Sequence, residues 1–212
     1  ALEPTRGAEV SAILAFDTSG ETMHVGLRIG SRDWLHESAG GAKASAELLP
    51  AIFSLLDRTG AQLHDLDAIG FGCGPGAFTG LRTACSVAQG LAVGAGKPVL
   101  AIDTLMAIAE DARQGSARMQ VWCAVDARMD QIYAAQYLHE SGHWTVLDVP
   151  MLASVDDLNR AWAGLPASHI AGNALLAFAG RIETGSAHRH AQAAPRAAPL
   201  LALAEQYWKQ GA

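Results

Sequence analysis

The sequence predicts an α/β protein built from two similar lobes, each a mixed sheet with flanking helices. Two observations carry this prediction. Apolar runs that end in aspartate recur at 13–17 (Ile-Leu-Ala-Phe-Asp) and 121–126 (Val-Trp-Cys-Ala-Val-Asp). After each run, the apolar period follows the order strand, strand, helix, strand, helix. With 212 residues, the chain is long enough for two compact lobes.

The first repeat is expected to contain strands at 13–17, 22–29, 32–37, 68–73 and 97–102. Helices are expected at 45–58 and 79–95, where apolar or small residues recur at helical spacing. Ser45 is predicted to cap the first of these helices, and Pro50 to kink or tighten its first turns.

The second repeat is expected to contain strands at 121–126, 131–137, 143–147 and 168–171, and helices at 104–113, 154–163, 174–182 and 196–209. We therefore expect a flexible tail over 1–12, a first lobe over 13–103 and a second, smaller lobe over 104–195. The closing helix, 196–210, is expected to pack back on the first lobe.

Composition indicates a globular protein, because half of the residues are apolar and only 17% are charged. The net charge of -6, without a dense Lys/Arg stripe, argues against a protein that grips nucleic acid alone. Cys73, Cys85 and Cys123 lie in apolar segments, as reduced and buried thiols of a cytoplasmic protein would. Neither a signal peptide nor an apolar run of roughly 18 residues is visible, so no membrane contact is expected.

The most distinctive stretch, residues 72–82, reads Gly-Cys-Gly-Pro-Gly-Ala-Phe-Thr-Gly-Leu-Arg. It predicts a strand, a glycine turn and the start of a helix, where free N–H groups favour an anion. The alternative is a tight turn that binds nothing. The stretch is neither a Walker A loop nor a G-x-G-x-x-G fingerprint, so it does not by itself predict nucleotide binding.

This stretch resembles the signature of the TsaB (YeaZ) family, through Gly74, Pro75, Gly76, Phe78, Thr79 and Gly80. Five more segments are similar to the family, in the expected order. They begin at Ile13 (Ile-Leu-Ala-Phe-Asp-Thr-Ser), Ser45 (Ser-Ala-Glu-Leu-Leu-Pro), Asp126 (Asp-Ala-Arg-Met-Asp-Gln-Ile-Tyr), Ala171 (Ala-Gly-Asn) and Pro195 (Pro-Arg-Ala). The resemblance thus covers the chain from about residue 13 onward.

The resemblance implies the actin-like, sugar-kinase-like ATPase fold. It also implies a non-catalytic subunit that activates the catalytic subunit TsaD by forming a heterodimer with it. Their complex forms threonylcarbamoyladenosine next to the anticodon of ANN-decoding tRNAs. The ATPase TsaE is expected to join the pair, tRNA to bind only through the complex, and the chain to form a homodimer when alone. No intrinsic cofactor is expected; ATP and metal belong to TsaD and TsaE.

The catalytic relative carries a His-x-x-x-His metal pair, and the matching positions here are Thr104 and Ile108. Threonine is a weak ligand and isoleucine is none, so the helix that follows is expected to serve packing alone. Asp17 and Asp126 end the first strand of each lobe, where this fold can hold a metal–nucleotide. The resemblance favours the alternative, in which both aspartates cap turns in a vestigial cleft.

Two other chemistries receive little support. Residues 139–143, His-Glu-Ser-Gly-His, match the zinc-protease pattern, but that chemistry needs a helix and the flanks predict strands. A solvated hairpin tip is the better interpretation, and His188-Arg-His190 is expected to lie in a loop. Ser19, Ser45 and Thr79 lack a recognisable histidine and carboxylate, so a hydrolase is not favoured.

The helices at 45–58 and 79–95 carry more apolar surface than one sheet contact requires. The resemblance assigns both helices to the contact with TsaD, although each could instead be sandwiched inside its own lobe. The predicted interface is Leu48, Leu49, Ile52, Phe53, Leu56, Phe78, Leu81, Arg82, Cys85, Ala88 and Ala92. Ile52→Asp or Ala88→Glu is then expected to abolish the heterodimer.

The sequence leaves one alternative function of a different class, an autonomous ATPase or small-molecule kinase of the same fold. Such an enzyme needs a second phosphate-binding motif, and none is recognisable here. The missing motif and the replaced metal ligands both favour the non-catalytic subunit.

Overall fold

The computed structural model describes residues 11–211 and shows two five-stranded sheets. The first sheet has the order β3-β2-β1-β4-β5. Its strands are β1 (Ala12–Asp17), β2 (Thr22–Ile29), β3 (Arg32–Ala39), β4 (Ala68–Gly72) and β5 (Val99–Ile102). β1, β2 and β3 pair antiparallel, whereas β4 and β5 continue the sheet in parallel with β1.

The second sheet repeats this topology strand for strand, with the order β10-β9-β6-β7-β8. Its strands are β6 (Met119–Arg128), β7 (Gln131–Glu140), β8 (His143–Ser154), β9 (His169–Ala171) and β10 (His188–His190). β6, β7 and β8 are antiparallel, and β9 and β10 are parallel with β6. The prediction of two similar lobes with mixed sheets is confirmed.

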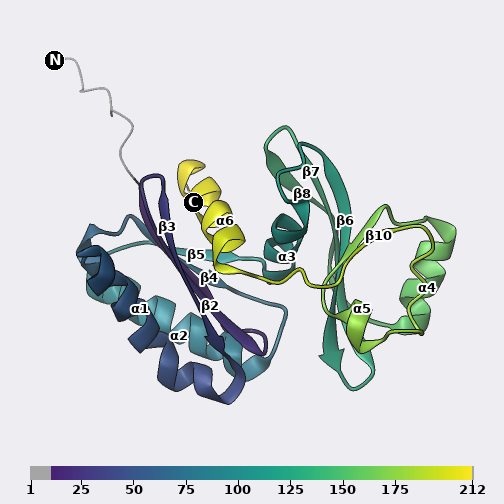
Figure 1. Ribbon diagram of the computed structural model, residues 1–212, viewed down its shortest axis with the longest axis horizontal. Coiled ribbons are helices and arrows are strands. Elements are labelled where there is room, and N and C mark those ends of the chain that lie inside the picture. Colours follow the sequence, from purple (N-terminus) through teal and green to yellow (C-terminus); the bar gives the residue numbers. More distant parts are fainter. Residues whose placement is uncertain (1–10, 212) are drawn as a thin grey trace.

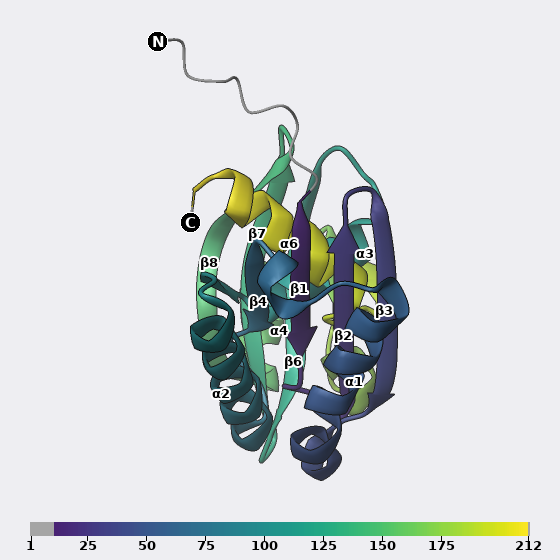
Figure 2. The same cartoon turned by 90° about the vertical axis from the view of Figure 1, so that its left-hand side faces the viewer.

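Helices form three layers around the two sheets (Figure 1). α1 (Ala44–Thr59) and α2 (Phe78–Ala95) cover the outer face of the first sheet, and Figure 2 shows both in front of its strands. α4 (Val155–Gly164) and α5 (Ala174–Ala177) cover the outer face of the second sheet. α3 (Thr104–Arg113) and α6 (Ala197–Lys209) lie between the sheets. Short 3₁₀ turns, η1 (Gly41–Lys43) and η2 (Leu63–Asp65), precede α1 and β4.

Successive side chains of β1 point to opposite faces of the sheet and therefore pack into two different cores. Ile13 and Ala15 point into the central core with α3 and α6, whereas Leu14 and Phe16 point toward α1 and α2. α6 approaches the first sheet closely, because a Cβ at Gly26 would lie 2.8 Å from a methyl carbon of Leu201. A third core lies under α4 and α5. Within residues 11–211, no helix combines the length and apolar character needed to cross a bilayer.

Three local predictions are wrong. Ser45 is not the helix cap, since η1 leads directly into α1 and the Ser45 hydroxyl donates to the carbonyl of Ala42. α5 ends at Ala177, and turns follow where the helix at 174–182 was expected. The segment expected as a loop at 188–190 is strand β10, because it pairs with β9, a partner that no local pattern reveals.

The cysteines and the tail also differ from expectation. All three cysteines are free, but only Cys123 is buried; Cys85 is partly exposed and Cys73 is exposed. Cys73 lies between the end of β4 and the glycine turn, and its backbone N–H donates to the Ile102 carbonyl. Of the predicted tail, 1–10 lies outside the described residues and Ala12 already belongs to β1.

Candidate functional site

The motif loop, residues 74–80, packs backbone against backbone on the turn between β1 and β2. A Cβ at Gly80 would lie 1.9 Å from the carbonyl oxygen of Thr18, and one at Gly76 would lie 2.6 Å from the Cβ of Ser19. The Thr18 hydroxyl donates to the Gly80 carbonyl at 2.7 Å, and the Ala77 N–H donates to the Ser19 carbonyl at 2.8 Å. The glycines are therefore required for this close approach, and a phosphate is not needed to explain them.

Asp17 is fully buried at the end of β1, and its two carboxylate oxygens are bonded by the chain itself. Oδ1 accepts from the N–H and the hydroxyl of Ser19, at 2.7 and 2.6 Å. Oδ2 accepts from the Thr104 hydroxyl at 2.8 Å, and that hydroxyl accepts from the Gly74 N–H at 3.1 Å. Burial raises the pKa of Asp17, and the hydrogen bonds from Ser19 and Thr104 oppose it.

The network around Asp17 does not fit a metal–nucleotide bound directly by this carboxylate. Both carboxylate oxygens already accept hydrogen bonds, and the backbone at Gly72 packs so closely that a Cβ there would lie 1.7 Å from Oδ2. The helix that begins at Thr104 was expected only to pack, and this prediction is wrong for Thr104, because its side chain links Asp17 to the motif loop. The one local signal is Asp103, an N-cap residue that places Thr104 at the first position of α3.

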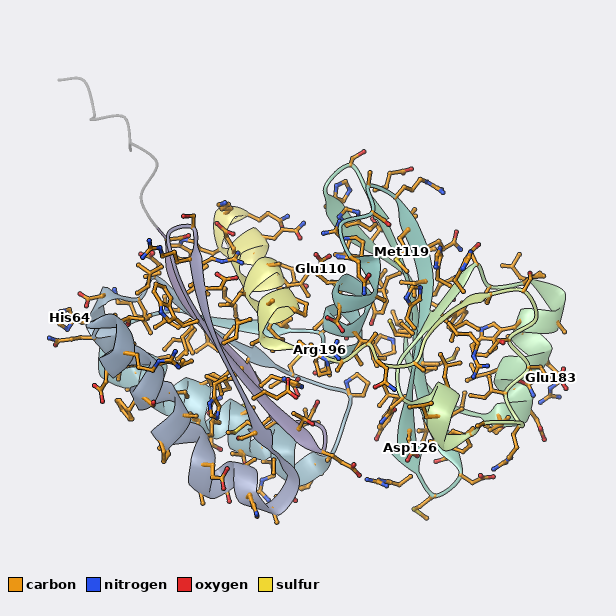
Figure 3. The ribbon with its side chains drawn as sticks, viewed as in Figure 1. His64, Glu110, Met119, Asp126, Glu183 and Arg196 are labelled. Carbon is orange, nitrogen blue, oxygen red and sulfur yellow. The ribbon has the colours of Figure 1, made fainter. Side chains whose placement is uncertain are left out.

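Asp126, the equivalent residue of the second lobe, belongs to a separate set of contacts. Its N–H donates to the Asn173 side chain at 2.9 Å, and its carboxylate accepts from the Arg128 N–H at 2.8 Å. Figure 3 shows Asp126 at the lower end of β6. Arg128 reaches across the lobes to Glu21, with 2.7 Å between guanidinium and carboxylate. Hydrogen bonds do not join Asp126 to Asp17 in the part of the chain that the structure describes.

The predicted interface divides into buried and exposed residues. Five members are buried in the core beneath α1 and α2, so their prediction as surface positions is wrong: Leu48, Ile52, Leu56, Ala88 and Ala92. They face the first sheet, because both helices lie flat on it. Ile52→Asp and Ala88→Glu would therefore disrupt this core and would not test a surface.

The other members lie on the outer side of the same helices. Phe78 is 72% exposed, Phe53 44% and Leu49 39%. Arg82 is exposed with its guanidinium carbon 5.5 Å from the Phe78 ring centre, and Leu81 and Cys85 are partly exposed. Val93, which was not among the predicted interface residues, is 86% exposed on α2, where helical spacing aligns it with Arg82. We call Leu49, Phe53, Phe78, Arg82 and Val93 the outer face of α1 and α2.

The zinc-protease pattern lies in a β-hairpin, as predicted. β7 and β8 are joined through Ser141 and Gly142, both with positive φ. His139 is buried, unlike the solvated tip that was expected: its Nδ1 lies 3.1 Å from the Ala117 carbonyl and its ring packs on Trp144. His143 is exposed. Among residues 11–211, no three metal-ligating side chains are grouped so as to hold an ion.

A groove of about 630 Å³ lies between α3, the β7–β8 turn and α6, and no motif-loop residue lines it. Figure 3 labels Glu110, which lines this groove from α3. Opposite charges on its wall are paired, with Arg113 bonded to Glu110 at 2.5 Å and Lys209 to Glu205 at 2.7 Å. The groove therefore selects no ligand charge.

Comparison with known proteins agrees with this geometry. Residues 28–180 match the model of the family described as TsaD: tRNA N6-adenosine threonylcarbamoyltransferase. The tRNA threonylcarbamoyladenosine biosynthesis protein TsaB of Escherichia coli (strain K12) is 37% identical over 133 residues, which are 62% of this chain and 58% of that protein. The protein of the same name from Haemophilus influenzae is 40% identical over 129 residues, 60% of this chain and 54% of that protein.

The match thus spans little more than half the length of these two relatives. The solved structure of YeaZ from Pseudomonas aeruginosa is similar over more of the chain. It is 34% identical, with a TM-score of 0.85, over 95% of this chain and 93% of that one. The motif loop, the repeated sheet topology and these matches lead to one conclusion: the chain belongs to the TsaB (YeaZ) family.

Proposed function

We propose that the chain is a non-catalytic subunit in the formation of threonylcarbamoyladenosine in tRNA. In this proposal it binds TsaD through the outer face of α1 and α2 and makes TsaD competent. The observation that carries the proposal is the Asp17 network, in which the fully buried carboxylate accepts from Ser19 and Thr104, and Gly74 donates to Thr104. The names of the TsaB relatives support the pathway.

The outer face of α1 and α2 supports a protein partner. Phe53, Phe78 and Val93 expose large apolar side chains on two neighbouring helices, although the sheet already has a complete core beneath them. Aromatic and arginine side chains are enriched among the residues that dominate binding energy at interfaces, and Phe78 with Arg82 offers both. The same face would serve a homodimer when TsaD is absent.

The remaining parts of the proposal follow from charge and from the network. With a net charge of -6, the chain contacts tRNA only through its partners, TsaD and TsaE. ATP and metal are assigned to those partners, because Asp17 is fully buried here and both of its carboxylate oxygens accept hydrogen bonds from the chain itself. The complex would assemble in the cytoplasm, where tRNA is modified.

Light scattering after size exclusion, on the chain alone and mixed with TsaD of the same organism, tests the proposal. We expect a heterodimer that replaces any homodimer. Phe78→Glu on the outer face should weaken it by about 30-fold, the effect of losing a hot spot of ~2 kcal/mol. Leu165→Glu is the matched control, because Leu165 is 69% exposed on the second lobe and should leave binding unchanged.

Two results would contradict the proposal. Unchanged binding by Phe78→Glu would remove the outer face as the contact. ATP hydrolysis by the isolated chain, together with no binding to TsaD, would favour the autonomous ATPase or small-molecule kinase. Loss of that hydrolysis in Asp17→Asn would then assign the activity to this chain and not to a contaminant.

A further inference from the structure

The equivalent edge strands of the two sheets are held by different side chains. β5 and β10 occupy this edge, since each pairs in parallel with the strand that lies beside the first strand of its lobe. On the face toward the central core, β5 places the buried residues Leu100 and Ile102. At the same register positions, β10 places His188 and His190. The edge that apolar packing holds in the first lobe therefore carries titratable side chains in the second.

These two imidazoles contact a third one on β9. His169 lies beside His188 in the strand register, and their rings are stacked with 5.0 Å between the centres. Nδ1 of His169 lies 3.1 Å from Nε2 of His190, the distance of a hydrogen bond between the rings. In such a bond one nitrogen donates and the other accepts, so at least one of the two rings must be neutral. The bond survives a first proton and is lost with a second.

The backbone adds little to the attachment of β10. The strand has three residues and a strand partner on one side alone. The His188 N–H donates to the Ser168 carbonyl at 2.9 Å, and the His190 carbonyl accepts from the Gly172 N–H at 3.1 Å. A short edge strand with so few bonds belongs to the least stable part of a fold and opens without global unfolding.

The charged groups on the elements around these rings already have partners. α3 packs against β9, and its Asp111 is bonded to Arg196. The neighbouring Glu110 is bonded to Arg113. Arg189 of β10 points to the opposite face, where it donates to a carbonyl of α5. The residues of β6 that pair with β9 are uncharged. A proton taken up by the imidazoles therefore gains no new counter-ion from these elements.

The pKa values of the bonded pair agree with this arrangement. Burial, followed by the imidazoles of His190 and His188, lowers the pKa of His169. Burial and then His188 lower the pKa of His190. A detached β10 would return both rings to water, where they bind protons more readily. The attached state should therefore lose stability as the pH falls below the ordinary histidine pKa of about 6.5 toward the lowered values.

We propose that the His169–His190 pair is a proton-sensitive link between β9 and β10. Near neutral pH, the hydrogen bond between the rings holds the edge of the second lobe closed. When both rings are protonated, two N–H groups face each other beside the stacked His188 ring, and β10 detaches from β9. The equivalent edge of the first lobe, which Leu100 and Ile102 hold, does not respond to acid in this range.

Hydrogen exchange of the full chain, followed for single amides by NMR at about pH 7.5 and about pH 5, tests the proposal. The reporter is the Gly172 N–H, which donates to the His190 carbonyl. Its internal control is the Cys73 N–H, which donates to the Ile102 carbonyl at the same place in the first lobe. After correction for the intrinsic exchange rate, the protection of Gly172 should fall at least about tenfold in acid, since one unit of pKa shift is worth a factor of ten. Cys73 should keep its protection.

His190→Ile gives β10 the side chain that β5 has at this position and removes the titratable pair. In this variant, the protection of Gly172 should be the same at both pH values. His143→Ala, which changes an exposed histidine of the β7–β8 hairpin, should behave as the unchanged protein does.

The comparison of Gly172 with Cys73 needs no variant, so it decides the question if His190→Ile fails to fold. Constant protection of Gly172 at the two pH values, or an equal loss of protection at Cys73, would overturn the proposal. The same loss in His190→Ile as in the unchanged protein would also overturn it.

Discussion

The two lobes have the same sheet topology, but the ends of their first strands have different environments. In the first lobe, Asp17 is fully buried and bonded to Ser19 and Thr104. In the second, Asp126 remains partly exposed beside Arg128, which pairs with Glu21 of the first lobe. The same place in the fold thus holds a closed network in one lobe and a solvated turn in the other.

Some of the closely packed glycines occupy equivalent positions in both lobes, and others occur in the first lobe alone. Gly72 is the last residue of β4, and Gly172 directly follows the equivalent strand β9. A Cβ at either glycine would collide with the first strand of its own sheet, at Asp17 or at Ala124. Gly76 and Gly80 occur only in the first lobe, where they bring the 18-residue α2 against the β1–β2 turn. The four-residue α5 takes its place in the second lobe. The difference teaches that the first two glycines serve the shared topology, and the other two position the helix that bears the outer face.

The largest effect is expected from a substitution that breaks the contact between α2 and the β1–β2 turn, which only the first lobe has. Gly80→Ala should lower the free energy of unfolding by about 3 kcal/mol, because its methyl group would overlap the Thr18 carbonyl. Urea denaturation measures this. Gly90→Ala on the same helix is the control: nothing lies within 4 Å of a Cβ there, so it should stabilise by ~0.5–1 kcal/mol. Equal effects of the two changes would refute the packing role of Gly80.

The next effect concerns the contact between lobes. Tyr137, buried on β7, donates to the Asp103 carboxylate at 2.6 Å, and Asp103 also caps α3. Tyr137→Phe should lower the free energy of unfolding by about 1.5 kcal/mol, as expected for a hydrogen bond to a charged group. Tyr207→Phe should change it less, since Tyr207 donates only to the Met106 sulfur at 3.4 Å. The reverse order in thermal unfolding would show that Asp103 does not join the lobes.

A change in pH dependence is expected at Asp17. Burial raises the pKa of Asp17, so the unfolded chain releases this proton at a lower pH than the folded chain does. Stability should therefore fall as the pH rises from the ordinary carboxyl pKa through the raised one. Asp17→Asn removes this contribution. The urea midpoint should fall less steeply between pH 4 and pH 8 in the variant than in the unchanged protein. An equally steep fall in both would show that other groups cause the pH dependence of stability.

The smallest effect is expected at the exposed ion pair that spans the lobes. Glu21→Gln breaks the contact with Arg128, but both side chains are largely exposed and screened by water. We expect no measurable change in the unfolding temperature at 0.15 M salt. A clear loss of stability would show that the solvated turn of the second lobe contributes to holding the lobes together.

Sequence periodicity predicts nearly every strand and helix, because the apolar patterns of β1, α1 and α2 are strong. It does not show which apolar stripe of a helix faces outward. On α1 both Ile52 and Phe53 are apolar, and only the sheet beneath decides that Ile52 is buried. Thr104 and β10 were missed for a related reason, since their partners are distant in sequence. Pairwise tertiary contacts leave no periodic signal.

Each of the two central helices packs against the sheet that does not precede it in the chain: α3 follows the first sheet but lies on the second, and α6 follows the second sheet but lies on the first. During synthesis, the central face of the first sheet therefore stays uncovered until the whole second lobe and α6 have left the ribosome. A chain that stops before Ala197 should bind an apolar dye that the longer chain does not. Despite its two lobes, the molecule can complete its fold only as one cooperative unit.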